Sequence, residues 1–300
     1  MRGSITILGT SSAAPTKDRF HSGQYFTFLR DVVLIDCGEG TQYRLLQYGL
    51  NYQKINHIFI SHLHGDHYLG LPGLINTMAL NSRSKPLTVY GPSGLSTILD
   101  AHFSSGKSHL SFDLTVEELQ AGERIELKSM TCEVVQLEHR IPCYGFRFVQ
   151  NQSDRKLNIA RCEELNIPVS VYSLLKEGAD YSDEHRQIGN VELTFPSDKP
   201  FSYGYMTDTR YLPELSEVFA ETDVLYHEAT YLSTLIDRAE ATFHSTAQQA
   251  GKFARLSAVN QLIIGHFSSR YDDLKPLLEE ARSEFPNTEL AVEAKTFEIS

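Results

Sequence analysis

A histidine-rich run at residues 61–67, Ser-His-Leu-His-Gly-Asp-His, restricts the possible folds of this chain more than any other feature of its sequence. It holds three of the 12 histidines found in 300 residues. Three buried imidazoles would lack hydrogen-bond partners unless they bound a metal, so His62, His64 and His67 are predicted metal ligands. The apolar residues 58–60 precede the run and predict a buried strand that ends where the ligand loop begins.

The spacing within this run predicts two metal ions. A loop can turn His62 and His64 toward one ion while Asp66 and His67 reach a second, which a strand or helix could not do. Three more candidate ligands each stand just past a predicted strand: His139, Asp208 and His266. Sites in open α/β sheets assemble at the carboxyl ends of strands, so these distant segments can converge there, with the Asp208 carboxylate bridging both ions.

Each of the three later candidates also has a structural interpretation. A single histidine after a strand, such as His139 or His266, is more often a hydrogen-bonded structural residue than a ligand. Asp208 precedes Thr209 and would equally suit a turn. From the residue pattern alone, the metal-ligand interpretation is clearly favoured only for the three clustered histidines.

Short apolar runs that alternate with helical patterns predict a layered α/β fold. The mainly apolar runs are typical of buried strands and lie at 32–35, 58–60, 134–137, 224–226 and 262–264. Apolar residues at helical spacing predict helices over 247–256 and 272–285. Residues 150–200 are more polar than their flanks, so we expect them to form an excursion from a single domain that spans 1–300.

Length and composition exclude several classes of protein. With 41% hydrophobic residues the chain can bury a sizeable core, and no stretch approaches the roughly 18 apolar residues of a membrane span. Since no signal-peptide pattern follows Met1, we expect a cytoplasmic protein without membrane association. The four cysteines form no Cys-x-x-Cys pair, which argues against a disulfide framework or a thiolate zinc site. The net charge of −11 argues against binding nucleic acid through bulk positive charge, although bound divalent cations would reverse the local field.

Several motifs, taken in order along the chain, resemble those of a known family. His62, His64, Asp66 and His67 match the His-x-His-x-Asp-His motif of the metallo-β-lactamase superfamily. More closely, the chain resembles the ribonuclease Z family, the endonucleases of tRNA 3′ ends, over nearly its whole length. The segments that carry this closer resemblance are 7–11, 34–42, 61–67, 144–146, 208–210, 227–230, 244–247 and 266–271.

The resemblance implies a four-layer αββα metallo-β-lactamase fold, with two mixed β-sheets sandwiched between helices. It also implies two zinc ions per chain, although imidazole and carboxylate ligands would accept manganese or iron. The ligand sets that it implies are His62, His64 and His139 for one ion and Asp66, His67 and His266 for the other, with Asp208 bridging. Asp36 would orient the histidine loop, and an Asx turn before Gly38 is the alternative interpretation of that residue.

The implied reaction is hydrolysis of a phosphodiester at the 3′ end of precursor tRNA, leaving a 3′-hydroxyl on the tRNA and a 5′-phosphate on the trailer. Two metal ions would activate a water and stabilise the charge on the phosphoryl oxygens. Asp66 would accept a proton from that water, and His244 would protonate the leaving oxygen. His227 and Glu228 would orient His244 or a metal ligand. The alternative for His244 is a helix N-terminal residue without a catalytic role.

Two segments carry candidate substrate contacts. Ser268, Ser269 and Arg270 directly follow the predicted ligand His266, where hydroxyl and guanidinium groups could hold a phosphate next to the scissile one. Lys17 and Arg19 resemble the Pro-x-Lys-x-Arg loop that the family places near its cleavage site. Phe20 stands where the family more often has Asn, so a solvated basic loop is the alternative here.

Residues 150–200 stand where the family carries an arm that grips the tRNA elbow, but they lack its Gly-Pro tip and have Ile167 to Gly178 instead. The cations expected to contact phosphates there are Arg155, Lys156, Arg161 and Lys176. Either a reduced arm binds tRNA differently, or the substrate is another phosphodiester.

The competing functions are a phosphodiesterase for cyclic nucleotides or other small diesters, and a non-catalytic RNA-binding homologue, against which the complete ligand set argues. The partners implied are precursor tRNA and a second copy of the chain in a homodimer.

Overall fold

The computed structural model describes residues 3–106 and 109–299, which fall into two compact units. The larger unit contains the chain up to Val149 and from Ser202 onward, and the smaller unit is Gln150–Phe201. The smaller unit occupies the residues that we expected to form an excursion. No helix in the described parts of the chain is long and apolar enough to cross a lipid bilayer.

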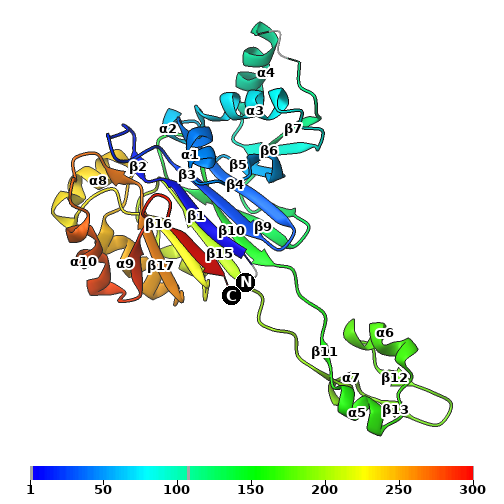
Figure 1. Cartoon of the computed structure of the whole chain (residues 1–300). Helices are drawn as coiled ribbons and strands as arrows, with labels where there is room; N and C mark the ends of the chain where they lie inside the picture. The colour runs from blue at the N-terminus through cyan, green and yellow to red at the C-terminus, as the bar shows by residue number, and fades with distance from the viewer. Residues whose placement is uncertain (1–2, 107–108, 300) are drawn as a thin grey trace. The chain divides into compact units, whose positions relative to one another are not determined.

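The first sheet of the larger unit has seven strands in the order β20-β1-β3-β4-β5-β6-β7. Its strands are β1 (Gly3–Gly9), β3 (Gly23–Phe28), β4 (Asp31–Cys37), β5 (His57–Phe59), β6 (Leu87–Gly91), β7 (Leu114–Glu118) and β20 (Thr296–Ile299). Strands β4 to β7 run parallel, whereas β20, β1 and β3 pair antiparallel, so the sheet is mixed. The helices on its outer face are α1 (Thr41–Gln47), α2 (Gly65–Tyr68), α3 (Leu71–Leu80) and α4 (Leu95–Ser105) (Figure 1).

The second sheet also has seven strands, in the order β19-β17-β16-β15-β10-β9-β8. Its strands are β8 (Arg124–Glu126), β9 (Met130–Leu137), β10 (Cys143–Gln150), β15 (Ser202–Met206), β16 (Val224–Glu228), β17 (Gln261–Gly265) and β19 (Thr288–Leu290). Strands β15, β16, β17 and β19 run parallel, and β10 pairs antiparallel with β15. The helices of this half are α8 (Ile236–Thr242), α9 (Ala247–Leu256) and α10 (Lys275–Glu284).

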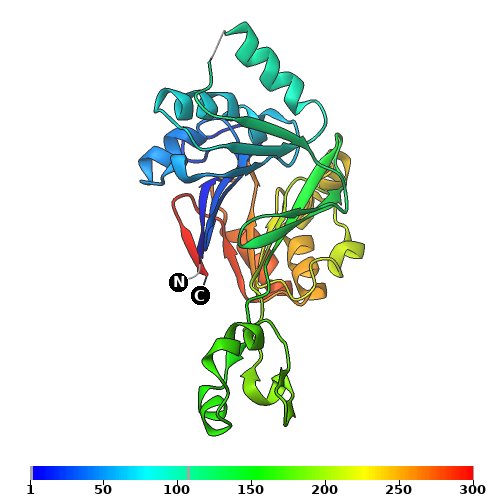
Figure 2. The ribbon, with the colours of Figure 1, turned by 90° about the vertical axis from the view of Figure 1, so that its right-hand side faces the viewer.

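The two sheets pack face to face through an aromatic layer. The ring of Phe59 on β5 lies 5.2 Å from that of Phe146 on β10, and Phe26 on β3 lies 5.2 Å from Tyr203 on β15. All four rings are buried, and burying such a side chain contributes roughly 1.5–3 kcal/mol. Helices cover the outer face of each sheet, so the predicted αββα order of layers is confirmed (Figures 1 and 2).

Four of the five apolar runs that predicted strands lie wholly in strands of these sheets, and the run 58–60 extends one residue beyond β5. The helix predicted over 247–256 is α9. Thr246 caps α9, because its side chain accepts a hydrogen bond from the backbone N–H of Gln249, whose side chain reciprocates. The second predicted helix, α10, begins at Lys275 rather than at residue 272, since Pro276 fits only the first turn of a helix.

The smaller unit has its own short elements and its own core. Its strands are β11 (Lys156–Leu157), β12 (Tyr181–Ser182), β13 (Gln187–Ile188) and β14 (Thr194–Phe195), with helices α5 (Ile159–Glu164), α6 (Tyr172–Lys176) and α7 (Asn190–Leu193). Six buried apolar side chains form the core: Cys162, Ile167, Leu175, Tyr181, Ile188 and Leu193. Buried Asn190 ties α6 to α7, since its side-chain N–H groups donate to the carbonyls of Leu175 and Ala179, both at 2.7 Å.

Candidate metal centre and active site

Four loops at the carboxyl ends of strands bring the predicted ligands together in the larger unit. The histidine run follows β5, His139 follows β9, Asp208 follows β15, and His266 directly follows β17. The strands belong to two different sheets that face one another, so their loops meet at one end of the sandwich. This convergence places seven ionisable side chains, from residues as far apart as His62 and His266, in two adjoining groups.

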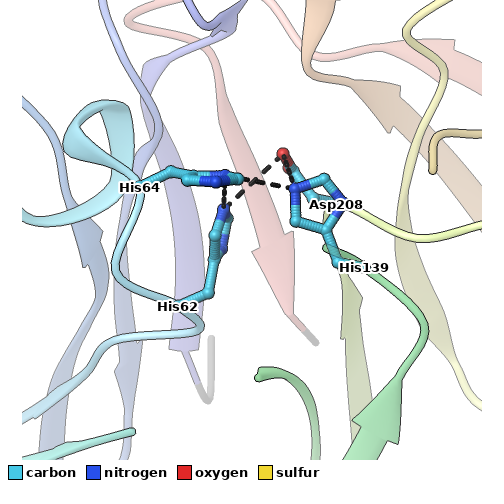
Figure 3. Close-up of side chains that lie close together, drawn as sticks. All are labelled: His62, His64, His139 and Asp208. Carbon is cyan, nitrogen blue, oxygen red and sulfur yellow. Dashed lines mark hydrogen bonds and ion pairs between the residues drawn. The ribbon is translucent and has the colours of Figure 1, made fainter. Parts of the chain in front are cut away.

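The first group contains His62, His64, His139 and Asp208, whose side chains point toward one another in Figure 3. The Nδ1 atom of His64 lies 3.1 Å from Nε2 of His62 and 3.1 Å from Nε2 of His139. The Oδ2 atom of Asp208 lies 3.7 Å from each of these Nε2 atoms. Three ring nitrogens and one carboxylate oxygen therefore converge on a single point.

The second group contains Asp66, His67 and His266, and Asp208 closes it as well. The Nε2 atoms of His67 and His266 lie 3.3 Å apart, and Oδ2 of Asp66 lies 3.5 and 3.6 Å from them. The Oδ1 atom of Asp208 lies 3.4 Å from His67 and 3.0 Å from His266. The two oxygens of Asp208 thus face different groups, which is the geometry of a bridging carboxylate.

The hydrogen bonds behind the rings show that these residues fit a metal. The Nδ1 atom of His139 lies 3.0 Å from the carbonyl oxygen of Phe243, which can only accept, so Nδ1 carries the proton. The lone pair of a neutral His139 is then on Nε2, which faces the nitrogens of the first group. Burial lowers the pKa of His62 well below its usual value, and His67 lowers it further, so this ring is also neutral. Converging lone pairs on neutral imidazoles are the donor set that zinc prefers.

The electrostatics of the second group also suit a cation. Burial by itself lowers the pKa of His67, but the carboxylates of Asp66, Asp208 and Asp36 outweigh burial and raise that pKa well above its usual value. Three carboxylates around one ring create a negative field, and the field that attracts a proton also attracts a divalent ion.

Asp36 lies behind the histidine loop and contacts it through both carboxylate oxygens. Its Oδ1 accepts from the backbone N–H of Ser61 at 2.8 Å, and its Oδ2 accepts from the Ser61 hydroxyl at 2.9 Å and from Nδ1 of His67 at 2.7 Å. The Tyr205 hydroxyl donates to the same Oδ2 at 2.7 Å.

Asp36 adopts a left-handed backbone with φ 55°, and so does His266 with φ 58°, a conformation that costs roughly 1–3 kcal/mol. Both strained residues orient or supply a predicted ligand.

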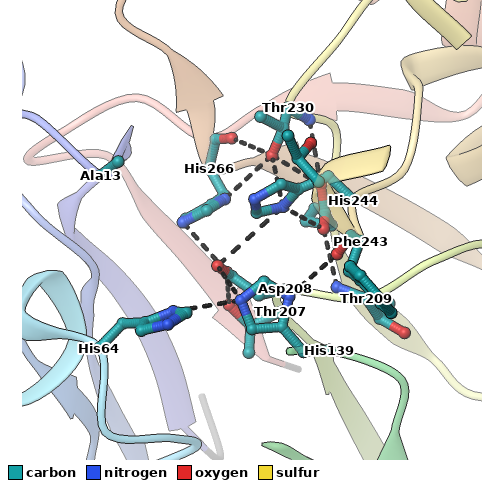
Figure 4. Close-up of polar contacts among 12 residues, drawn as sticks. Ala13, His64, His139, Thr207, Asp208, Thr209, Thr230, Phe243, His244 and His266 are labelled. Carbon is teal, nitrogen blue, oxygen red and sulfur yellow. Dashed lines mark hydrogen bonds and ion pairs between the residues drawn. The ribbon is translucent and has the colours of Figure 1, made fainter. Parts of the chain in front are cut away.

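His244 lies beside Asp208 and His266 (Figure 4), and it bonds to Glu228. Its Nδ1 is 2.8 Å from Oε1 of Glu228 and 4.0 Å from Oδ2 of Asp208, and its ring stacks on that of His266 at 5.5 Å. Burial alone would lower the pKa of His244, but the Glu228 carboxylate raises it to about 9. The bond to Glu228 therefore favours the protonated form of this imidazole, which is held next to the two ligand groups.

Glu228 orients His244, whereas the structure does not bring His227 to the site. The Glu228 carboxylate is fixed by the backbone N–H of Thr209 at 2.8 Å and by the Thr230 hydroxyl at 2.6 Å. His227 is the neighbouring residue in β16, and successive side chains in a strand point to opposite faces. Its ring lies 5.4 Å from that of Phe253 on α9, so the structure places the His227 side chain in the core and away from His244.

The predicted substrate residues divide into two kinds. Ser268, Ser269 and Arg270 line a cleft of about 600 Å³ over the ligand groups. Lys17 has a side chain that is 90% exposed, and its ammonium lies 3.8 Å from the carboxylate of its neighbour Asp18. Arg19 donates to the backbone carbonyls of Tyr271 at 2.8 Å and Ser268 at 3.2 Å, so it holds the 268–271 loop instead of presenting its guanidinium to a ligand.

Several residues of the site escaped prediction because their roles depend on contacts between distant segments. Ser61 and Thr230 stand inside the motifs that the sequence showed, next to predicted residues, but only the fold reveals what they bond. Tyr205 gave no signal, since it reads as a strand residue. Gly38 was part of a motif, and its role is steric: a Cβ atom there would lie 2.3 Å from the backbone oxygen of Asp66. The cleft is also lined by Arg140 and Arg238, which no motif indicated.

The αββα sandwich and the two ligand groups at one end of it define a metal-dependent hydrolase of the metallo-β-lactamase fold. The metallo-beta-lactamase fold protein YhfI from Bacillus subtilis shares this fold, with a TM-score of 0.71 at 16% identity over 98% of each chain. The crystal structure of human tRNase Z, short form, has a TM-score of 0.72 at 26% identity over 99% of each chain.

Relatives at higher identity define the family. Ribonuclease Z of Bacteroides fragilis is 40% identical over 293 residues, with 96% of each chain covered. A family model described as Anti-Pycsar protein Apyc1 matches residues 3–165, which include the histidine loop and His139. The chain belongs to the ribonuclease Z family, and through residues 3–165 also to the family of that model.

Proposed function

We propose that this protein is a two-zinc endoribonuclease that removes the 3′ trailer from precursor tRNA in the cytoplasm, leaving a 3′-hydroxyl on the tRNA and a 5′-phosphate on the trailer. The observation that carries the proposal is the pair of ligand groups that share Asp208, with His244 beside them. The ligands proposed are His62, His64 and His139 on one side and Asp66, His67 and His266 on the other, with Asp208 common to both. Membership in the ribonuclease Z family supports the choice of substrate.

Two zinc ions, when bound, supply an activated water and positive charge for the phosphoryl oxygens. Asp66 is proposed to accept the proton of the attacking water. Its Oδ2 is held by the backbone N–H of Ala13 at 2.8 Å, so the carboxylate is already oriented. His244 is proposed to donate a proton to the leaving 3′ oxygen, and its bond to Glu228 keeps the ring charged and aimed.

Contacts to the RNA are proposed at two places. Ser268, Ser269 and Arg270 line the cleft and would hold a phosphate next to the scissile one. The Gln150–Phe201 unit is proposed to contact the tRNA away from the cleavage site. A homodimer is proposed as well, from the family resemblance alone.

The proposal is tested by incubating the purified, zinc-loaded protein with a precursor tRNA that carries a 3′ trailer, beside bis(p-nitrophenyl) phosphate and a cyclic nucleotide. We expect one cut, with a 3′-hydroxyl on the tRNA fragment and a 5′-phosphate on the trailer. The Asp66→Ala variant, purified in parallel, controls for contaminating nucleases. Hydrolysis of the small diesters without tRNA cleavage would favour the small-diester phosphodiesterase. RNA binding without hydrolysis of any substrate would favour a non-catalytic homologue.

A further inference from the structure

A second cleft, of about 750 Å³, lies at the opposite end of the first sheet from the metal loops. Its walls include His57, the first residue of β5, and the segments that lead into β4 and β6, whereas the histidine loop follows the last residue of β5. The basic residues that line this cleft are Arg30, Lys54, Arg83, Lys85 and Lys128, and none of its lining residues is acidic. We refer to it as the basic cleft.

This concentration of positive charge runs against the composition of the protein. The chain has 38 acidic and 27 basic residues, so a cleft lined by five of its cations and no carboxylate is a strong local excess. Four of the five side chains, those of Arg30, Lys54, Lys85 and Lys128, belong to exposed residues. Within residues 3–106 and 109–299, none of these four has a carboxylate within ion-pair distance. Like charges held together without counter-charges repel one another, which lowers stability unless a ligand neutralises them.

Arg83 fixes two of the loops that carry these cations. It is only 4% exposed, and its guanidinium donates to four backbone carbonyls, those of Gln53 and Ile55 on one loop and Lys85 and Pro86 on the other, at 2.7 to 3.1 Å. Lys54 lies inside the first loop and Lys85 inside the second. The buried guanidinium therefore sets the positions of both lysines and adds its own charge beneath them.

The third loop, which carries Lys128, is fixed by Asp31, the acidic residue that follows Arg30 in the sequence. The buried Asp31 carboxylate accepts from the backbone N–H groups of Lys128 and Ser129, at 3.3 and 2.6 Å. Both carboxylate oxygens of Asp31 accept from backbone N–H groups, so they do not pair with the Lys128 ammonium. The Ser129 hydroxyl accepts from the backbone N–H of Arg30 at 3.2 Å and joins that loop to the same support.

We propose that the basic cleft binds phosphate groups of the RNA substrate at a place remote from the metal centre. This inference rests on the proposed function for the identity of the RNA. Phosphate oxygens suit lysine and arginine donors, and neutralising them gives RNA binding its dependence on salt. The four exposed cations come from four separate loops, which matches several phosphates along a chain better than one small anion. A free nucleoside triphosphate would offer the same chemistry and is separated from RNA by the experiment.

The test compares two triple variants of the full-length zinc-loaded protein that change net charge equally. Lys54→Gln, Lys85→Gln and Lys128→Gln remove cations of the basic cleft. Lys252→Gln, Arg255→Gln and Lys275→Gln remove cations that are already paired with Glu284 or Glu279. The dissociation constant for mature tRNA, which needs no cleavage to bind, is measured for each protein from low to high salt.

We expect the cleft variant to bind mature tRNA roughly tenfold more weakly than the wild type at physiological salt. The slope of log K against log salt should fall by about two to three, since each lost phosphate contact removes about 0.7 to 0.9. The control variant should match the wild type, and both variants should hydrolyse bis(p-nitrophenyl) phosphate at the wild-type rate. If the triple variant melts early, the Lys85→Gln single variant should still lower the slope by about one.

An unchanged affinity and slope in a folded cleft variant would overturn the inference. So would unchanged tRNA binding with a loss of binding to a nucleoside triphosphate, because the cleft would then serve a small anion. If the wild type binds tRNA through the cleft but leaves precursor tRNA uncut, the proposed function fails and the RNA site stands. The reverse result, cleavage without any effect of the cleft variant, leaves the function and removes the site.

Discussion

The larger unit and the Gln150–Phe201 unit use their charged side chains in opposite ways. In the larger unit, proposed ligands such as His67 and His139 bond outward to Asp36 and to the Phe243 carbonyl, and their remaining nitrogens face the two ligand groups. In the smaller unit the cations predicted to contact phosphates are largely satisfied by their neighbours: Lys156 by Asp198 at 2.6 Å, Arg161 by Glu164 and Glu192, and Arg155 by the Thr194 hydroxyl at 2.7 Å.

This difference separates chemistry from recognition. Groups whose outer atoms are fixed and whose inner atoms face one another are ready to bind an ion, whereas cations already paired with carboxylates offer little free charge to an RNA. If the smaller unit recognises tRNA, we expect it to do so through shape and backbone contacts more than through these cations. Within residues 3–106 and 109–299, four exposed cations that have no carboxylate partner gather instead in the larger unit, in the basic cleft.

The largest effect is expected from Asp208→Ala, which removes the one side chain common to both ligand groups. Hydrolysis of every phosphodiester, large or small, should become undetectable. The wild type is expected to hold about two zinc ions per chain, and elemental analysis of the variant should show fewer. Chelation of the wild type should have the same effect on activity. An active wild-type enzyme with one ion or none would contradict the two-metal site.

His244→Ala should lower the single-turnover rate on precursor tRNA by ~10²- to 10⁴-fold, as is typical of a lost general acid. The defect should shrink on bis(p-nitrophenyl) phosphate, because p-nitrophenolate leaves without a proton. Unchanged RNA affinity, measured in parallel, would show that the loss is chemical. A near-normal single-turnover rate on RNA would remove His244 from the mechanism.

Glu228→Gln should have a smaller effect, on the order of 10- to 100-fold, because it removes the charge that orients His244 but leaves the ring. Since both residues act as one unit, the Glu228→Gln, His244→Ala double variant should be no slower than His244→Ala alone. Additive losses would instead indicate that Glu228 has a separate role, such as supporting the 209–230 loops through Thr209 and Thr230.

The sequence predicted the parts of this molecule that local spacing encodes. Buried strands appear in the sequence as apolar runs, and three histidines within six residues form an evident cluster. The layered α/β fold and the clustered ligand candidates could therefore be predicted from the sequence. Their places just past predicted strands made His139, Asp208 and His266 candidates, but a single residue there also suits a structural role, so the family resemblance was needed to favour the ligand interpretation.

The alternation of side chains along a strand could have predicted that only one of Glu228 and His227 faces the site, since neighbours in β16 point to opposite faces of the sheet. The hydrogen bonds of Ser61, Tyr205 and Thr230, and the clamp that Arg83 forms, depend on backbone atoms from distant loops, which leave no pattern in the sequence. The contacts of Arg19 could not be predicted for the same reason, as the carbonyls that it binds belong to residues some 250 positions away.

Replacing residues 151–200 with a short Gly-Ser linker should raise KM for precursor tRNA by roughly tenfold, about 1.4 kcal/mol of lost binding. Gln150 and Phe201 are kept because their backbones hydrogen-bond to each other at the base of the unit. Hydrolysis of bis(p-nitrophenyl) phosphate should not change, since that substrate contacts only the metal centre. Loss of both activities would show that the unit supports the fold of the larger one, and unchanged tRNA cleavage would place recognition elsewhere, with the basic cleft the first candidate.

The smallest effect is expected from Lys156→Gln, which tests whether pairing within the smaller unit really withholds charge from RNA. Lys156 is bonded to Asp198, so an RNA phosphate would have to compete with that carboxylate, and the tRNA dissociation constant should change by less than roughly twofold. The matched variant is Lys85→Gln, an exposed lysine of the basic cleft, for which we expect a larger change and a shallower salt dependence. If Lys156→Gln weakened binding as much as Lys85→Gln, the ion pair would open when RNA binds. The contrast between the two units would then hold only for the free protein.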